Sequence, residues 1–268
     1  METKAREATL ESDGVLLHEE DIVDLVARAL AGRELPDVAF DDPAARRMLD
    51  ALEIDRDRYE RARLRPALAI TMVIDAVVRD FFVRHPDGLA IGVNQGLSTR
   101  FERIDNGVLR WIDVDPPQLA SFKASLVPTC ERHLMAACCS LRCAGWTECL
   151  RAARDVPTIV VAQGTLRRAT HEELDAFLLQ AGKNLGPATE LVLDYDARSP
   201  LRPSALGRSG ACLESPSPDG AVVRYPRVRY VSTDEYAPDL AHAVSGVNGV
   251  SRLFRGRGVA SLAHLRFV

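Results

Sequence analysis

The stretch of sequence that decides the fold runs from residue 89 to residue 101. It reads Leu89-Ala90-Ile91-Gly92-Val93-Asn94-Gln95-Gly96-Leu97-Ser98-Thr99-Arg100-Phe101. The apolar run at its start, bounded by turn residues, predicts a buried strand over 89–93. Gly96 lets the backbone turn and approach a ligand closely. A helix after this turn would offer free N–H groups at its positive end, an arrangement shared by many nucleotide-binding α/β proteins.

Strands and helices alternate downstream of this stretch. Further strands are predicted over 108–114, 133–138, 158–162 and 190–195, with helices over 116–126 and from Thr170 onward. Thr170 and Glu173 have the spacing of a helix-capping box. This alternation predicts parallel βαβ units and therefore a doubly wound α/β sheet.

The two ends of the chain depart from this alternation. Upstream, three helices are predicted, over 19–31, 43–49 and 65–84. Residues 1–86 are therefore expected to form an N-terminal helical cap, compact with an α/β domain over 87–268. Downstream, the Pro-, Ser- and Gly-rich residues 199–219 are predicted to be a loop. The tail has two predicted strands, 227–231 and 259–268, around a helix-like segment at 234–243, and we expect an antiparallel hairpin at the sheet edge.

Composition excludes several classes of protein. Of 268 residues, 34 are Lys or Arg and 38 are Asp or Glu, which gives a net charge of -4 and argues against a general nucleic-acid binder. Hydrophobic residues make up 47% and charged residues 27%, so the chain is not broadly disordered. The longest apolar stretch, 67–74, is far shorter than the ~20 residues that span a membrane. The polar start shows no signal peptide, and we expect a cytoplasmic protein with a small-molecule substrate.

The cysteines do not indicate a metal site. Five of the six fall between Cys130 and Cys149, without the paired C-x-x-C spacing of zinc ligands. A disulfide framework is not expected in a long chain without a signal peptide. We therefore expect reduced cysteines that act as small buried hydrophobic residues, and no bound metal.

An acidic residue at the end of the second strand could bind a ribose diol. Asp113 and Asp115 both lie there, and either carboxylate could accept hydrogen bonds from the two hydroxyls. The dinucleotide fingerprint G-x-G-x-x-G is absent, which argues against a dehydrogenase.

A series of segments, in order, is more specific. It comprises Asp42-Pro43 with Ala45, Gly92–Phe101, Leu109–Pro117, Lys123, Ser140–Arg142, Trp146 and Val161–Leu166. The series resembles the leucine carboxyl methyltransferase and polyketide O-methyltransferase group, whose pattern is L-G-A-G-L-D-T-R followed by W-[FY]-[ED]-V-D-x-P. The resemblance covers about residues 27–195. It implies a Rossmann-like, seven-stranded class I methyltransferase sheet, S-adenosylmethionine as cofactor, and methyl transfer to a carboxylate or hydroxyl of a small molecule such as a polyketide.

The resemblance also implies a set of cofactor-binding positions, several of which carry unusual residues. The positions are Asn94, Gly96, Arg100, Asp113, Ser140, Leu141 and Gln163. Asn94 stands where the family has a glycine, Ser98 and Ser140 replace aspartates, Gln163 replaces a glutamate, and Ile70 replaces an arginine. Neutral groups at two former acids predict cofactor binding weaker by about tenfold to a hundredfold. Whether Arg142 compensates is left open by the sequence.

Other residues are expected to line the acceptor site or the core. Gly164, Arg167, Arg168, His171 and Tyr230 are the predicted substrate-binding residues, and Tyr225 and Tyr236 flank the same region. Arg100 either recognises a carboxylate or pairs with an acidic neighbour, while Trp146, Phe177, His133 and His264 are expected to be packed. Two alternative functions stay open, namely a non-methylating enzyme on the same scaffold and a non-catalytic accessory or binding protein. The oligomeric state is not determined by the sequence.

Overall fold

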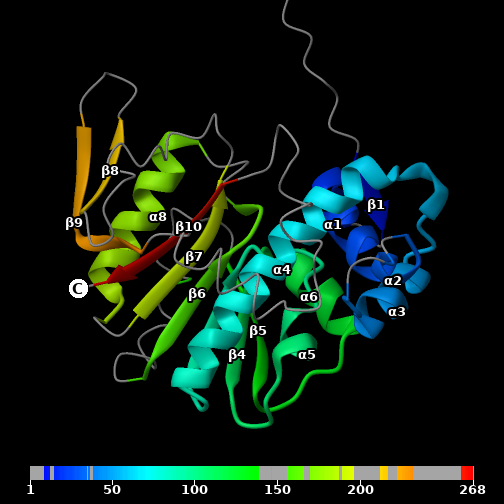
Figure 1. Ribbon diagram of the computed structural model, residues 1–268, viewed down its shortest axis with the longest axis horizontal. Helices are drawn as coiled ribbons and strands as arrows, with labels where there is room; N and C mark the ends of the chain where they lie inside the picture. Colours follow the sequence, from blue (N-terminus) through cyan, green and yellow to red (C-terminus); the bar gives the residue numbers. More distant parts are fainter. Residues whose placement is uncertain are drawn as a thin grey trace, which may run out of the picture.

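The computed structural model describes residues 9–12, 15–34, 36, 39–138, 146, 156–165, 170–186, 189–195, 212–216, 222–231 and 261–267. Its centre is an eight-stranded sheet in the order β5-β4-β3-β6-β7-β10-β9-β8 (Figure 1). The predicted segments Ser140, Leu141, Arg142, Arg167, Arg168 and 234–243 lie outside the described residues.

Five strands of the sheet are parallel, as the alternation predicts. They are β3 (Leu89–Val93), β4 (Arg110–Asp115), β5 (His133–Ala137), β6 (Thr158–Ala162) and β7 (Thr189–Tyr195). β10 (Ser261–Phe267) lies antiparallel between β7 and β9 (Val222–Val231), which confirms the predicted antiparallel pair, although neither strand forms the edge of the sheet. The α/β sheet of the class I methyltransferase type is therefore confirmed.

The prediction that residues 199–219 are all loop was wrong. β8 (Cys212–Pro216) lies within this range and forms the sheet edge beside β9, so the sheet has eight strands rather than seven. The local sequence Cys-Leu-Glu-Ser-Pro has weak strand propensity. The strand is therefore stabilised by its antiparallel pairing with β9. A proline is tolerated there because an edge strand leaves one row of N–H groups unpaired.

The three helices predicted upstream of the sheet are confirmed, with a β-hairpin as an addition. Upstream of the sheet lie α1 (Glu19–Ala29), α2 (Ala31–Glu34), α3 (Pro43–Ala51), the 3-10 turn η1 (Arg56–Arg58) and α4 (Arg61–Arg84). Between the strands of the sheet lie α5 (Arg100–Ile104), α6 (Pro117–Leu126) and α8 (His171–Asn184). A hairpin of β1 (Thr9–Ser12) and β2 (Val15–His18) precedes them and was not predicted. The capping box at α8 is present, because the Thr170 side chain accepts from the Glu173 N–H and the Glu173 carboxylate accepts from the Thr170 N–H.

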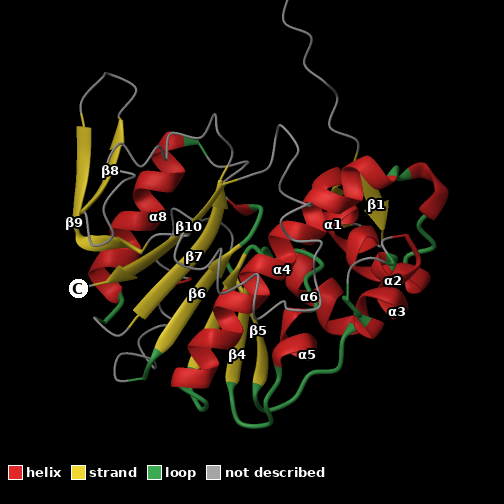
Figure 2. Cartoon of the chain, viewed as in Figure 1, coloured by secondary structure: helices red, strands yellow, loops and turns green. Residues whose placement is uncertain are grey.

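Helices cover both faces of the sheet (Figure 2). On one face, α8 places Phe177 in the core with Ile91 and Leu191, and Trp146 stacks on Phe177 with ring centroids 4.8 Å apart. The core positions predicted for Trp146 and Phe177 are thus confirmed. On the other face, α4 packs Val77 against the strands.

Helix α4 connects the cap to the sheet. Its first half places Leu64 and Leu68 in the cap core with Leu25 of α1, whereas its second half places Val77 and Phe81 on the sheet. One helix therefore belongs to both hydrophobic cores, and the cap is held at one end of the strands. Within the described residues, no helix is both long enough and apolar enough to cross a membrane.

Candidate functional site

The turn after β3 lies at the point where the direction of the sheet order reverses. β3 pairs with β4 on one side and with β6 on the other, so the turn opens where ligands of α/β sheets bind. Asn94 and Gly96 both have left-handed backbones, with φ of 49° and 55°. Asn is among the few residues besides Gly that tolerate this conformation. Helix α5, which follows, is only five residues long, so its dipole contributes little to ligand binding.

The Gln95 side chain folds back beneath this turn. Its Nε2 donates to the Val93 carbonyl at 3.2 Å and to the Val161 carbonyl at 3.0 Å, and so lies across the ends of the two central strands. A Cβ at Gly92 would lie 2.4 Å from the Gln95 Cγ, so glycine is required at position 92 for this packing. No local pattern in the sequence indicates this contact.

A buried ion-pair network supports the turn from the cap side. Asp75 of α4 lies between Arg100 Nε at 2.7 Å and Arg103 Nε at 2.8 Å, and Arg103 also contacts Asp42. Burial raises the pKa of Asp75, but the two guanidinium groups outweigh it and lower the pKa to about 2. Of the two interpretations of Arg100, the structure supports pairing with an acidic neighbour. Asp42 also caps α3 by accepting from the Ala45 N–H at 2.8 Å.

Asp113, the predicted ribose ligand, is surrounded by protein donors. Trp111 Nε1 lies 2.9 Å from its Oδ1, while Lys123 Nζ and His133 Nε2 lie 2.7 Å and 3.0 Å from its Oδ2. Burial raises the pKa of Asp113, yet the charge of Lys123 and the hydrogen bond of His133 lower it below its ordinary value. The role of Asp113 in cofactor binding stays a prediction, with both of its oxygens engaged inside the protein. The predicted packing of His133 is confirmed, since it is buried and stacks on Phe101.

Asp115 differs from Asp113 although the two are only two residues apart. Its Oδ1 accepts from the Gly96 N–H at 3.1 Å, whereas its Oδ2 is buried and has no hydrogen-bond partner in the described part of the chain. Lys123 Nζ remains 3.9 Å away. Burial raises the pKa of Asp115 to about 7, against the attraction of Lys123 and together with the repulsion of Asp113. The free oxygen beside the glycine turn makes Asp115 the better-placed acceptor.

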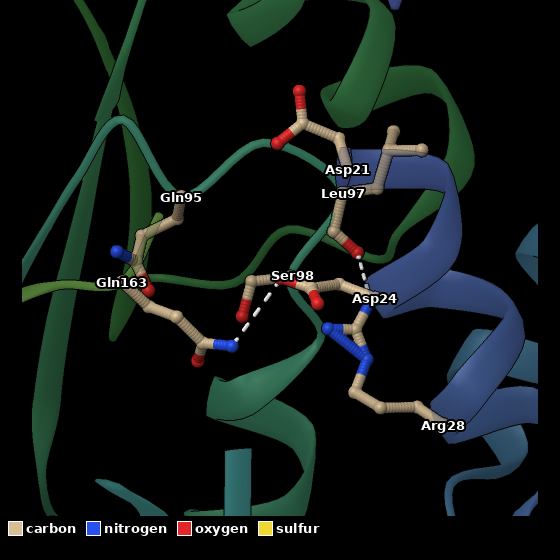
Figure 3. A pocket seen from close by; sticks show the side chains of 7 residues that line it. All are labelled: Asp21, Asp24, Arg28, Gln95, Leu97, Ser98 and Gln163. Atoms are coloured by element: carbon tan, nitrogen blue, oxygen red, sulfur yellow. Dashed lines mark hydrogen bonds between the residues drawn. The ribbon is translucent and has the colours of Figure 1, made fainter. Parts of the chain in front are cut away.

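A polar pocket opens beside the turn (Figure 3). It is small, partly open to solvent, and lined by Asp21, Asp24, Arg28, Gln95, Leu97, Ser98 and Gln163. The three charged residues come from one face of α1, at spacings of three and four. Asp21 lies against the turn, because its Oδ1 would be 3.0 Å from a Cβ at Gly96. Sequence reasoning missed this charged face, whose only signal was the spacing of 21, 24 and 28 along the helix.

Arg28 supplies the positive charge of the pocket. It is 3% exposed and donates from Nη2 to the Leu97 carbonyl at 2.8 Å. Its Nε lies 3.6 Å from the Asp42 carboxylate and has no hydrogen-bond partner among the described residues. Burial, together with the neighbouring charge of Arg103, lowers the pKa of Arg28 to about 10. The pocket therefore presents a buried, charged N–H group.

The structure brings some of the predicted site residues together and separates others. Asn94, Gly96 and Gln163 surround the end of the central strands, and Gly164, with a left-handed φ of 71°, donates its N–H to Asp194 at 2.6 Å. His171 is the first residue of α8, and Tyr230 lies on β9 opposite Leu265 of β10. The predicted packing of His264 is confirmed, because it is buried against Glu190 at 2.9 Å. In the described portion, no three His, Cys, Asp or Glu side chains group as metal ligands.

The sheet order, the antiparallel closing strand and the site at the reversal point define an α/β fold of the class I methyltransferase type. No protein-family model and no curated protein matches the chain. Three similar solved structures are a proposed methyltransferase from Thermobifida fusca YX, the glycopeptide N-methyltransferase MtfA complexed with S-adenosylmethionine, and the PH0226 protein from Pyrococcus horikoshii OT3.

The three likenesses are distant. The T. fusca protein is 16% identical over 65% of this chain and 66% of its own, with a TM-score of 0.43. MtfA is 13% identical over 72% of this chain and 87% of its own, with a TM-score of 0.39. PH0226 is 10% identical over 73% of this chain and 88% of its own, with a TM-score of 0.42. At these values the likenesses assign no activity and no residue role to this chain.

Proposed function

We propose that this protein is an S-adenosylmethionine-dependent methyltransferase that modifies a carboxylate or hydroxyl of a small molecule, such as a polyketide. The observation that carries the proposal is the buried Oδ2 of Asp115 beside the Gly96 turn, which has no hydrogen-bond partner among the described residues and only a distant ion pair with Lys123. A buried carboxylate oxygen without a partner is costly, and a ribose diol would supply the missing donors. The turn lies where α/β sheets bind nucleotides.

The charges around the turn favour this cofactor over a phosphorylated one. Asp21 and Asp115 flank Gly96 on two sides, and their carboxylates would repel a phosphate group. The pocket combines Asp21 and Asp24 with Arg28, which suits a ligand that carries both an ammonium and a carboxylate group. S-adenosylmethionine has both groups, together with the ribose diol.

The main role of this chain in the reaction would be to align the acceptor with the methyl group. When bound, S-adenosylmethionine supplies a methyl group that is electrophilic because it is attached to a sulfonium. A carboxylate acceptor is already nucleophilic, so holding it in line supplies most of the acceleration. A hydroxyl acceptor would in addition need a base for its proton. We propose that the acceptor lies near Gly164 and the start of α8, with Arg167, Arg168, His171 and Tyr230 as its expected contacts.

Calorimetric titration tests the cofactor. Wild-type protein should bind S-adenosylmethionine and S-adenosylhomocysteine, and should not bind NAD⁺. Asp115→Asn should weaken binding by about 1–3 kcal/mol, because one buried carboxylate–hydroxyl hydrogen bond is lost. Asp87→Asn, at an exposed turn residue, is the matched control and should bind like the wild type. Absence of binding to both adenosyl ligands by the wild type would overturn the proposal.

One observation favours the alternative of a binding protein or a non-methylating enzyme. The Gln95 amide already occupies the Val93 and Val161 carbonyls at the strand ends, where part of a ligand would otherwise donate. A site closed in this way would hold the nucleoside and leave the amino-acid portion outside. Comparing the affinities for adenosine and for S-adenosylhomocysteine distinguishes the methyltransferase from this alternative. Affinity at least tenfold higher for S-adenosylhomocysteine supports the methyltransferase, whereas equal affinity supports the alternative.

A further inference from the structure

The amide of Gln163 is held in one orientation by its neighbours. Arg100 Nη2 donates to one end of the amide, and because a guanidinium has only donors, that end must be the carbonyl oxygen. The NH₂ end then donates to Thr71 Oγ1 at 3.0 Å and points at Asp24 Oδ2 at 3.4 Å. The orientation of Gln163 therefore follows from the chemistry of Arg100 and needs no further assumption.

A carboxylate at position 163 would not fit these partners. One of its oxygens could still accept from Arg100, but the other would face the Asp24 carboxylate across the 3.4 Å now spanned by a hydrogen bond. Two carboxylates so close cannot both be ionised without a large cost. The pair of positions 24 and 163 therefore carries a single negative charge, and this chain places that charge on α1.

Two groups in the pocket lack a hydrogen-bond partner among the described residues. Ser98 Oγ is buried and makes no hydrogen bond within the described structure, and the same holds for Arg28 Nε. Asp24 and Arg28 are four residues apart on α1, so they face the same pocket (Figure 3). The pocket thus offers two acceptors, on Asp24 and Ser98, and one charged donor, on Arg28.

We infer that Asp24, held in place by Gln163, binds the α-ammonium group of the ligand together with Ser98 Oγ. This inference rests on the proposed function and names the residues that recognise the amino-acid end of the cofactor. An ammonium has three N–H donors and satisfies both acceptors, whereas a sulfonium has no N–H and would leave Ser98 unpaired. The carboxylate on the same carbon atom then lies toward the guanidinium group of Arg28, which lines the pocket.

The test measures binding of S-adenosylhomocysteine and of its desamino analogue, which lacks the ammonium, by calorimetry. Asp24→Asn should weaken S-adenosylhomocysteine binding about tenfold or more and leave binding of the analogue unchanged. Gln163→Glu should also weaken binding of S-adenosylhomocysteine, since it sets two carboxylates against each other. The double variant Asp24→Asn with Gln163→Glu restores one charge to the pair and should recover affinity to within about threefold of the wild type.

Glu20→Gln is the matched control, because it removes a carboxylate from an exposed position on the same helix and should change neither affinity. Equal losses for S-adenosylhomocysteine and the analogue in Asp24→Asn would indicate a structural role and overturn the assignment. Unchanged affinity in that variant, or no recovery in the double variant, would overturn it as well. Wild-type protein that binds neither S-adenosylhomocysteine nor S-adenosylmethionine would instead overturn the proposed function, and the ammonium assignment with it.

Discussion

Asp75 on α4 and Asp115 at the end of β4 are both completely buried, yet the protein treats their charges in opposite ways. Asp75 is held by two guanidinium groups within 3 Å, and its pKa falls to about 2. Asp115 accepts one backbone N–H on Oδ1, its Oδ2 lies 3.9 Å from Lys123 with no hydrogen-bond partner among the described residues, and burial raises its pKa to about 7. Both oxygens of the Asp75 carboxylate are paired with guanidinium groups, whereas one oxygen of Asp115 has no hydrogen-bond partner among the described residues.

This contrast separates a structural site from the proposed ligand site. The Asp75 network joins α4 to α5 and, through Arg103 and Asp42, to the start of α3. Replacing any member leaves an opposite charge buried without compensation. At Asp115, by contrast, one carboxylate oxygen has only the distant Lys123 as a counter-charge and no hydrogen-bond partner in the described part of the chain. Several buried polar atoms of the described residues lack a hydrogen-bond partner, and Oδ2 of Asp115 is the one whose carboxylate also binds the Gly96 turn.

The largest expected effect comes from breaking the closed network. Asp75→Asn leaves Arg100 and Arg103 buried with one counter-charge fewer, and should lower the free energy of unfolding by about 3–5 kcal/mol. Urea denaturation followed by circular dichroism measures it. Asp80→Asn, on the same helix in an exposed pair with Arg84, is the control and should change stability by less than about 0.5 kcal/mol. A loss below 1 kcal/mol in Asp75→Asn would show that the network is not a main support of the fold.

The second prediction uses pH to compare the two carboxylates. Because the pKa of Asp115 is raised from 3.8 to about 7, the folded state keeps a proton that the unfolded state releases, and stability falls as pH rises from about 4 to 7. Asp75 has the opposite sign, because its pKa is lowered to about 2 and its contribution is lost as pH falls from about 4 to 2.

The measurement is the free energy of unfolding of wild-type protein and Asp115→Asn at about pH 4.5 and pH 7.5. Asparagine cannot titrate, so the wild type should lose about 1–3 kcal/mol more than the variant over this interval. Parallel pH profiles for the two proteins would mean that Asp115 ionises normally in the folded state.

The smallest effect concerns the glycine that connects Asp115 to the pocket. Gly96 has a φ of 55°, and a Cβ there would lie 3.0 Å from Asp21 Oδ1, whereas Gly107 has a φ of 87° with open space around it. Gly107→Ala should therefore cost about 1 kcal/mol for its backbone alone, and Gly96→Ala about 1–2 kcal/mol. Only Gly96→Ala should also weaken S-adenosylhomocysteine binding. If the two variants lose the same free energy of unfolding and both bind S-adenosylhomocysteine like the wild type, the ligand does not closely approach the turn at Gly96.

Much of the fold could be predicted from the sequence, because the patterns that indicate its strands and helices are local. The apolar run at 89–93 and the run at 158–162 have the same bounds as β3 and β6, since a continuous apolar segment can only be buried in the centre of a sheet. The box at Thr170 and Glu173 depends on two residues three apart, and it is present as predicted. In contrast, β8 and the hairpin of β1 and β2 have weak local preferences and are fixed by the strands that pair with them.

In the candidate site, too, some features could be predicted from the sequence and others depend on the tertiary structure. The sequence by itself determined the glycine turn, its place after the first strand of the sheet, and the two aspartates at the end of the next strand. Only the tertiary structure distinguished those aspartates, by bringing Lys123 and His133 to Asp113 and leaving one oxygen of Asp115 without a hydrogen-bond donor in the described part of the chain. It also brought the charged face of α1 over the turn and set Asp24 against Gln163, 139 residues away. Burial and the partners of a charge depend on contacts between distant segments, and these control its pKa and its chemistry.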